Sequence, residues 1–222
     1  DLQSVKKLPK KIKSKVIQDL KNITSKKEFL GKKPHIIMGV LNMTPDSFSD
    51  GGKYNSFIKA NKRIKNLIRS GADIIDIGGE STRPGSKVIN PKSELERVKN
   101  VIAKFKKNFS GTLLSIDTRK SQVIDFAIKK NVDIVNDVSC FKFDQNTLKF
   151  VRNRNIWKII HHMQGTPQTM QINPKYNHVL LDIYDFFEKE IKNFNNDKYK
   201  KKLILDPGIG FGKKLKHNLM IL

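Results

Sequence analysis

Six short runs of apolar, mostly β-branched residues recur along this 222-residue chain, and each ends in a polar residue or a glycine-rich turn. Runs of this kind are typical of strands that are buried on both faces, as in a parallel sheet. Segments with the spacing of amphipathic helices separate them, so strand and helix alternate along the chain. The runs are HIIMGVLN (35–42), DIIDIGGE (73–80), LLSIDT (113–118), DIVNDV (133–138), WKIIHHM (157–163) and LILDPG (203–208).

The alternation predicts right-handed βαβ units and an α/β fold, the TIM (β/α)8 barrel. A closed barrel needs eight units, and about six are visible, so we expect the C-terminal units to be missing from this chain. In the helix at 93–109, Ser93 followed by Glu96 predicts a capping box. The expected helices are 56–70, 93–109, 120–130, 146–154, 178–194, the start of another at 216–222, and a short one around 12–21.

Charge and composition divide the chain into a basic lead-in or linker, 1–33, and a barrel domain, 34–222. The net charge of +23 comes from 44 Lys and Arg against 21 Asp and Glu. The lysines are spread over helices and loops, and no nucleic-acid motif or membrane-length apolar run is visible. We therefore interpret the charge as solvated helix faces that attract anions at long range, and expect neither nucleic acid nor a membrane as partner.

Cysteine usage favours a reducing compartment, the cytoplasm, because Cys140 is the only cysteine and no disulfide can form within the chain. Cys140 follows the fourth predicted strand. No base stands next to it in the sequence, so we interpret it as a buried, inert thiol rather than a nucleophile.

Polar side chains stand where the predicted strands end. Because the carboxyl ends of parallel strands meet at one mouth of a barrel, we expect these side chains to converge in one cleft. They are Asn42, Asp76, Glu80, Asp117, Asn136, Asp137, His162 and Asp206. Two polar, glycine-rich loops, 42–52 and 78–85, also leave this mouth; they are either ordinary turns or loops that close over a substrate.

The motifs GVLNMTPDSFSDGG, IIDIGGESTRPG, SIDT, IVNDV, HMQGTPQTMQ and LILDPGIGFGK, in this order, closely resemble the dihydropteroate synthase family of pterin-binding TIM barrels. The similarity runs from about Pro34 to Leu222. It implies a transferase of folate biosynthesis that condenses 6-hydroxymethyl-7,8-dihydropterin pyrophosphate with p-aminobenzoate to 7,8-dihydropteroate and pyrophosphate. Sulfonamides would compete with p-aminobenzoate.

A pterin presents a ring N–H beside an amino group, and one carboxylate can accept from both. Asp206, at the exit of an apolar strand, is placed to do so. By resemblance, Asn136 and Asp117 complete the pterin pocket, and Phe211 closes over the pterin. The alternative role for Asp206 is that of a helix N-cap before the glycine-rich turn that follows it.

The resemblance also implies Mg²⁺, contacted by Asn42, because this ion prefers oxygen ligands and keeps several positions for water or substrate. Thr82 and Arg83 resemble contacts on the phosphate side. Asp117 and Asp50 are the expected catalytic carboxylates.

In that mechanism pyrophosphate leaves first, and the two carboxylates stabilise the pterin-methyl cation. Phe48 and Pro84 resemble the apolar walls around the p-aminobenzoate ring.

The chain departs from the family pattern at His161, where the family often has Met. His161 and His162 are adjacent on a strand and point to opposite faces, so they do not form a metal site together. The family's Ser-Arg-Lys and Arg-x-His motifs would lie beyond Leu222. We therefore expect residues 1–222 alone to be inactive, and the full-length form to be a homodimer.

Two alternatives stay open at this point. A pterin-dependent methyltransferase that binds methyltetrahydrofolate would share Asn136 and Asp206, but it does not need the two phosphate-side loops. An inactive basic barrel fragment that associates with nucleic acid would show salt-dependent retention on DNA.

Overall fold

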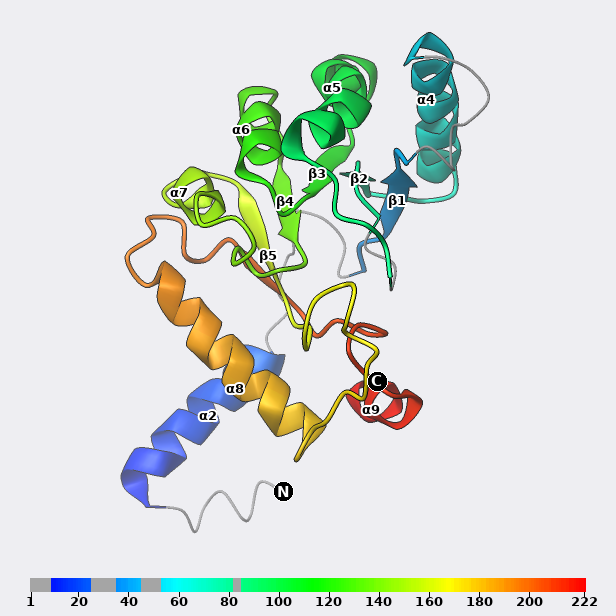
Figure 1. Cartoon of the computed structure of the whole chain (residues 1–222). Helices are drawn as coiled ribbons and strands as arrows, with labels where there is room; N and C mark the ends of the chain where they lie inside the picture. The colour runs from blue at the N-terminus through cyan, green and yellow to red at the C-terminus, as the bar shows by residue number, and fades with distance from the viewer. Residues whose placement is uncertain (1–8, 25–34, 45–52, 82–84) are drawn as a thin grey trace. The chain divides into compact units, whose positions relative to one another are not determined.

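The computed structural model describes residues 9–24, 35–44, 53–81 and 85–222. The chain separates into two compact units, Asp1–Ile36 and Ile37–Leu222. In the first unit, the described residues form helix α2 (Lys10–Thr24), which contains the short helix expected at 12–21. The second unit holds the sheet and all the other described helices (Figure 1).

One parallel sheet forms the centre of the second unit. Its strands are β1 (Met38–Asn42), β2 (Ile74–Gly78), β3 (Leu113–Asp117), β4 (Ile134–Asp137), β5 (Trp157–His161) and β6 (Leu203–Asp206). Their order in the sheet is β1-β2-β3-β4-β5-β6, so each strand pairs with its neighbours in sequence. Each of the six apolar runs contains one of these strands, which confirms the strand predictions.

A helix follows every strand, and helices α4, α5 and α6 lie side by side along one face of the sheet in Figure 1. The helices are α4 (Lys53–Arg69), α5 (Pro91–Asn108), α6 (Ser121–Lys129), α7 (Thr147–Val151), α8 (Val179–Ile191) with the 3-10 turn η1 (Lys192–Phe194), and α9 (Leu215–Ile221). The described residues therefore contain six βα units, as expected for an α/β protein with six of the eight units of a TIM barrel.

The capping box expected at Ser93 and Glu96 is wrong. Helix α5 begins earlier, and Asn90 is its N-cap: the Asn90 side chain accepts a hydrogen bond from the Ser93 N–H at 2.7 Å. Pro91 occupies the first turn, where its fixed φ suits the helix and its missing N–H needs no partner. The pair Asn90-Pro91 is therefore the true start signal of this helix.

The core lies between the sheet and these helices. Alternate side chains of each strand, including Ile75, Leu114 and Ile160, are buried against helix residues such as Ile64 and Phe105. Because side chains alternate along a strand, the residues between them project from the other face of the sheet, which is the inner face of a barrel.

Two aspartates at the starts of strands help to fix the strand register. Asp73, before β2, accepts the Ile37 N–H at 3.1 Å, and Asp133, before β4, accepts the Leu114 N–H at 2.7 Å. Lys106 of α5 forms an ion pair with Asp133. At this end of the sheet, then, the acids have donors.

None of the described helices is long and apolar enough to cross a bilayer.

A buried ion pair anchors the segment between α8 and β6. Lys158 on β5 lies 3.0 Å from Asp197, and both side chains are fully buried. Lys158 also donates to the Arg154 carbonyl at 3.3 Å. A buried pair of this kind contributes little over an apolar pair, but removing one partner strands the other charge.

We expect Asp197→Asn to lower the free energy of unfolding by about 3 to 5 kcal/mol, because the buried Lys158 loses its carboxylate partner. The matched control is Asp125→Asn, which breaks the exposed pair between Lys129 and Asp125 and should cost less than about 1 kcal/mol. Urea denaturation followed by circular dichroism measures both. Equal losses in the two variants would contradict the importance of the buried pair.

Candidate functional site

The register of the sheet brings three sequence-predicted residues into one row, together with Gly78. Asn42 pairs with Gly78, Gly78 with Asp117, and Asp117 with Asn136. Residues that are register partners project from the same face of a parallel sheet, so the side chains of Asn42, Asp117 and Asn136 share the inner face. The predicted convergence at the strand ends is confirmed for these three residues.

Gly78 creates the space in which two of these side chains meet. A Cβ placed on Gly78 would lie 3.3 Å from Asp117 Oδ2 and 3.5 Å from Asn42 Oδ1. The two oxygens therefore approach from β3 and β1 over a strand that has no side chain at this point. A larger residue would push them apart.

Asp76, two residues before Gly78, shares the same inner face and lies beside Ser115 in the register. The Asn136 Nδ2 donates to Asp76 Oδ2 at 3.0 Å. Ser115 also donates to Asp76, whereas Asn136 Oδ1 is buried and has no hydrogen-bond partner among the described residues. Buried polar atoms are normally satisfied, so this oxygen points to a ligand that supplies a donor.

The electrostatics of this inner face also favour a ligand with N–H groups or positive charge. Burial, and then the negative charges of Asp76, Glu94, Asp137 and Glu80, raise the pKa of Asp117 well above its ordinary value. Burial likewise raises the pKa of Asp76. Carboxyls shifted by burial and by like charges are typical of functional sites.

Asp206 stands at the end of β6, level with His161 in the register. Its Oδ1 accepts the Gly208 N–H at 2.8 Å, while its Oδ2 lies 3.9 Å from His161 Nε2. The helix N-cap role expected as the alternative for Asp206 is wrong, because Lys214 is the N-cap of α9; Asp206 caps only the turn, with one oxygen. The side chain stays 44% exposed, and the Phe211 ring packs edge-on against His161 with centroids 4.8 Å apart.

The turn after Asp206 fits tightly against β5. Gly208 has φ +66°, and a Cβ there would lie 2.0 Å from the His162 carbonyl oxygen. Lys213 holds the far end of the turn: its Nζ lies 2.9 Å from His162 Nδ1 and donates to the Phe211 carbonyl at 3.0 Å. Burial lowers the pKa of Lys213 to about 8.

His161, the last residue of β5, and His162, which follows it, point apart, as predicted. His161 faces the inner side, whereas the His162 ring packs against Phe186 of α8 with centroids 4.8 Å apart. Burial, together with the nearby positive charge of Lys213, lowers the pKa of His162 to about 4. The described residues contain no group of three or more His, Cys, Asp or Glu that could hold a metal ion.

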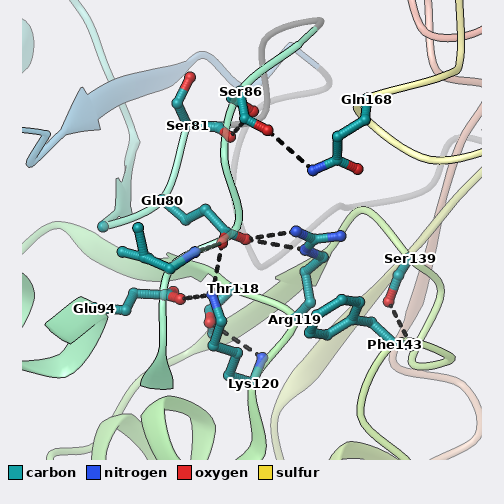
Figure 2. A network of polar contacts seen from close by, with 12 residues as sticks. Glu80, Ser81, Ser86, Glu94, Thr118, Arg119, Lys120, Ser139, Phe143 and Gln168 are labelled. Atoms are coloured by element: carbon teal, nitrogen blue, oxygen red, sulfur yellow. Dashed lines mark hydrogen bonds and ion pairs between the residues drawn. The ribbon is translucent and has the colours of Figure 1, made fainter. Parts of the chain in front are cut away.

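A buried cluster of charges lies beneath the loop that follows β2 (Figure 2). Arg119 donates to Glu80 Oε2 through Nε at 3.0 Å and Nη2 at 2.8 Å. Lys120 donates to Glu80 Oε1 at 2.8 Å and also pairs with Glu94 of α5. All four side chains are 5% exposed or less.

Glu80 also joins the two ends of this loop, because its Oε1 accepts the Ile89 N–H at 2.9 Å. Burial alone would raise the pKa of Glu80. The hydrogen bonds from Lys120, the Ile89 N–H and Arg119 more than offset burial and hold this pKa below its ordinary value.

Further contacts link this loop to neighbouring loops at the mouth, as Figure 2 shows. Gln168, after β5, donates to the Ser86 carbonyl at 3.0 Å, and the Arg119 guanidinium lies 4.1 Å from the centre of the Phe143 ring, which follows β4. Arg119, Phe143 and His161 also line one pocket. Loops that are distant in sequence thus share one polar framework.

Five of the predicted site residues lie outside the described residues: Phe48, Asp50, Thr82, Arg83 and Pro84. Their roles stay predictions. Of the other five, Asn42, Asp117 and Asn136 lie together on β1, β3 and β4, whereas Asp206 and Phe211 lie at the end of β6 beside His161.

The sequence pattern of the pterin binding enzyme family matches residues 38–222. The chain belongs to the family of pterin-binding enzymes. A curated relative, the dihydropteroate synthase of Escherichia coli strain K12, is 42% identical over 190 residues, which are 85% of this chain and 66% of the relative. The chain thus spans slightly less than two thirds of that enzyme's length.

Solved structures of dihydropteroate synthases also resemble this pterin-binding enzyme. The Yersinia pestis enzyme, in a complex with a sulfonamide drug, is 38% identical with a TM-score of 0.75, over 84% of this chain and 67% of that one. The Xanthomonas albilineans enzyme with 4-aminobenzoic acid is 34% identical with a TM-score of 0.75, over 84% and 66% of the two chains.

Sequence reasoning gave no role to several residues that the structure makes prominent in this pterin-binding enzyme. Asp76 was placed at the mouth without a function, although an acid inside an otherwise apolar strand was a usable signal. Arg119 and Lys120 follow the SIDT motif directly, but their partner Glu80 lies about 40 residues away. No local pattern reveals such a pairing.

Cys140 is buried and lies 3.8 Å from Glu190 Oε2. Burial and the adjacent negative charge raise the pKa of its thiol to about 12. A thiol with this pKa carries almost no thiolate at neutral pH, which supports the inert role expected for it.

Asp137 gives a pH-dependent test of this pterin-binding enzyme. Its Oδ1 accepts from the Ser139 N–H and hydroxyl at 2.8 and 2.6 Å, its Oδ2 has no partner among the described residues, and burial raises its pKa to about 6. The unfolded chain releases this proton near pH 4, whereas the folded state keeps it to about pH 6. The free energy of unfolding therefore falls as pH rises through this window.

Asp137→Asn should remove that fall. We expect the variant to be more stable than the wild type by about 3 kcal/mol at pH 7.5, and the difference to shrink towards pH 4. Urea unfolding at several pH values measures it, with the exposed Asp185→Asn as control. A constant difference across the pH range would show that Asp137 does not titrate in this way.

Proposed function

We propose that the whole protein is a dihydropteroate synthase, which condenses 6-hydroxymethyl-7,8-dihydropterin pyrophosphate with p-aminobenzoate to 7,8-dihydropteroate and pyrophosphate. The main support is the buried Asn136 Oδ1, which has no donor among the described residues and lies on the inner face beside the carboxyl groups of Asp76 and Asp117. A pterin edge carries several N–H donors that match these acceptors. The named relatives with bound sulfonamide and 4-aminobenzoic acid support the second substrate and its competitor.

In this proposal the pterin lies between the two parts of the site. Asp206 accepts from the ring N–H and the amino group, while Asn136 pairs with the remaining ring edge. Phe211, already packed on His161, covers one side of the ring. The sequence motifs that this chain shares with dihydropteroate synthases favour this reaction over methyl transfer from methyltetrahydrofolate. The similarity to the named dihydropteroate synthases favours it as well.

Asn42 and Asp117 fit a magnesium ion of the kind that this reaction uses. Their side-chain oxygens approach each other over Gly78, and Mg²⁺ prefers oxygen ligands. The described residues offer no cage of three or more acidic or thiolate ligands, so the phosphates of the substrate and water would complete the shell. When bound, Mg²⁺ neutralises negative charge on the pyrophosphate.

Among the described residues, Asp117 best suits the charge that develops on the pterin. Burial and then the neighbouring carboxylates raise its pKa, and the negative field of those carboxylates stabilises a positive charge that appears beside it. Departure of pyrophosphate leaves such a charge on the pterin methylene group, and the amine of p-aminobenzoate then attacks it. Asp50 is proposed as the second carboxylate in this step.

The remaining predicted roles belong to the same proposal. Thr82 and Arg83 bind the phosphate side, and Phe48 and Pro84 enclose the p-aminobenzoate ring. A cytoplasmic location, which the single buried cysteine favours, and a homodimer are also proposals. Sedimentation of the whole protein tests the homodimer.

Asp206→Asn should weaken binding of the pterin pyrophosphate by about 2 to 4 kcal/mol, because an amide donor replaces an acceptor that faces the pterin N–H groups. Isothermal titration calorimetry on the whole protein measures this loss, and a product assay measures dihydropteroate. Asp185→Asn on the exposed side of α8 is the matched control and should bind as the wild type does. Unchanged affinity in Asp206→Asn would exclude Asp206 as the pterin acceptor.

Mg²⁺ should bind weakly to the protein alone and much more tightly when a pyrophosphate-bearing substrate is present, since Asn42 and Asp117 supply only part of its shell. Titration of Mg²⁺ with and without inorganic pyrophosphate distinguishes the two states. Asn42→Ala should reduce the increase in Mg²⁺ affinity that pyrophosphate produces. Tight binding without pyrophosphate would instead indicate a site built by the protein.

A further inference from the structure

His161 has a fixed orientation at the end of β5. Its Nδ1 lies 3.3 Å from the Val138 carbonyl oxygen, and its ring packs edge-on against Phe211. A Cβ on Gly208 would lie 3.0 Å from His161 Nε2, so the backbone of the turn after β6 lies close to the imidazole ring. The side chain is only 4% exposed.

These contacts define the tautomer of the ring. A carbonyl oxygen can only accept, so Nδ1 must carry the hydrogen that joins it to Val138. In a neutral imidazole the other nitrogen is then an acceptor, and this Nε2 lies 3.9 Å from Asp206 Oδ2. Burial and the positive charge of Lys213 favour this neutral form, whereas Asp206 opposes them, and burial prevails: the pKa of His161 is lowered.

Nε2 and the Asp206 carboxylate are therefore two acceptors side by side. They are 3.9 Å apart, too far for a hydrogen bond between them. Asp206 Oδ1 already accepts the Gly208 N–H. A ligand group that carries two hydrogens on one nitrogen fits between Oδ2 and Nε2, giving one hydrogen to each.

We propose that His161 is a specificity-determining residue, whose Nε2 accepts a hydrogen bond from the 2-amino group of the pterin while Asp206 accepts the other amino hydrogen and the ring N–H. This inference rests on the proposed function and extends it. The ring N–H and the amino group present three hydrogens, and Asp206 Oδ1 shares its capacity with Gly208. His161 supplies the third acceptor.

The consequence is selection by the group at position 2 of the pteridine. A 2-amino compound satisfies both Asp206 and His161. A 2-oxo compound places an oxygen against two acceptors, so it loses the hydrogen bond and leaves Nε2 unpaired. Lumazine, which is 2,4-dioxopteridine, and pterin, which is 2-amino-4-oxopteridine, differ in this group.

The test compares the binding of pterin and lumazine to wild-type protein and to His161→Phe, by quenching of ligand fluorescence. Phe keeps a flat ring against Phe211 but has no acceptor. We expect the preference of the wild type for pterin over lumazine to fall about 3- to 10-fold in His161→Phe, the loss of one neutral hydrogen bond. Lumazine affinity should stay the same or rise.

His161→Gln provides the second variant, because its amide oxygen can accept in place of Nε2 and should restore part of the preference. His178→Asn, which replaces the N-cap of α8 with another capping residue, is the control histidine and should change neither affinity. An unchanged preference in His161→Phe, or an equal loss for both ligands, would overturn the role of His161 while leaving the proposed function intact. Failure of the wild type to bind pterin at all would overturn both.

Discussion

Six strands that pair only in parallel must all end at the same edge of the sheet, and the rest of the structure depends on this constraint. The register then decides which side chains share a face. It brings Asn42, Asp117 and Asn136 together on the inner face, from segments that are almost 100 residues apart in the chain. The helices cover the opposite face with apolar residues, so nothing from the core neutralises the polar inner side.

The acidic side chains fall into three groups that differ in their hydrogen-bond and ion-pair partners. At the strand starts, Asp73 and Asp133 accept backbone N–H groups and so support the register. Beneath the second mouth loop, Glu80 forms ion pairs with Arg119 and Lys120, which balance its charge. On the inner face, in contrast, Asp76 and Asp117 form no ion pair with any described residue.

The difference between paired and unpaired acids indicates the position of the functional site better than the net charge of the chain does. The chain carries +23, yet the inner carboxyl groups of Asp76 and Asp117 have raised pKa values, because buried carboxyls respond to burial and near neighbours rather than to distant lysines. Unpaired acceptors cost stability in the free protein. A ligand with N–H donors would satisfy these acceptors, so its binding would also stabilise the folded protein.

The sequence could predict the elements that follow from periodicity. All six strands, the helices between them and most polar residues at strand exits follow local patterns and are predicted from them, but His162, which is expected in the cleft, packs against Phe186 of α8 instead. The start of α5 was misjudged because Ser93 and Glu96 imitate a capping signal that Asn90 and Pro91 provide in fact. Partnerships such as Glu80 with Arg119 join residues about 40 positions apart, and no periodicity encodes them.

The turn after β6 has a consequence for how this sequence can change over evolutionary time. At Gly208 any side chain would meet the backbone of β5, since a Cβ would lie 2.0 Å from a carbonyl oxygen. Gly210, in the same turn, also has a positive φ, but no atom lies within 4 Å of its would-be Cβ. Asn or Asp, which tolerate this backbone conformation, could therefore replace Gly210 with a modest loss of stability. At Gly208, in contrast, any other amino acid would force the backbone to move.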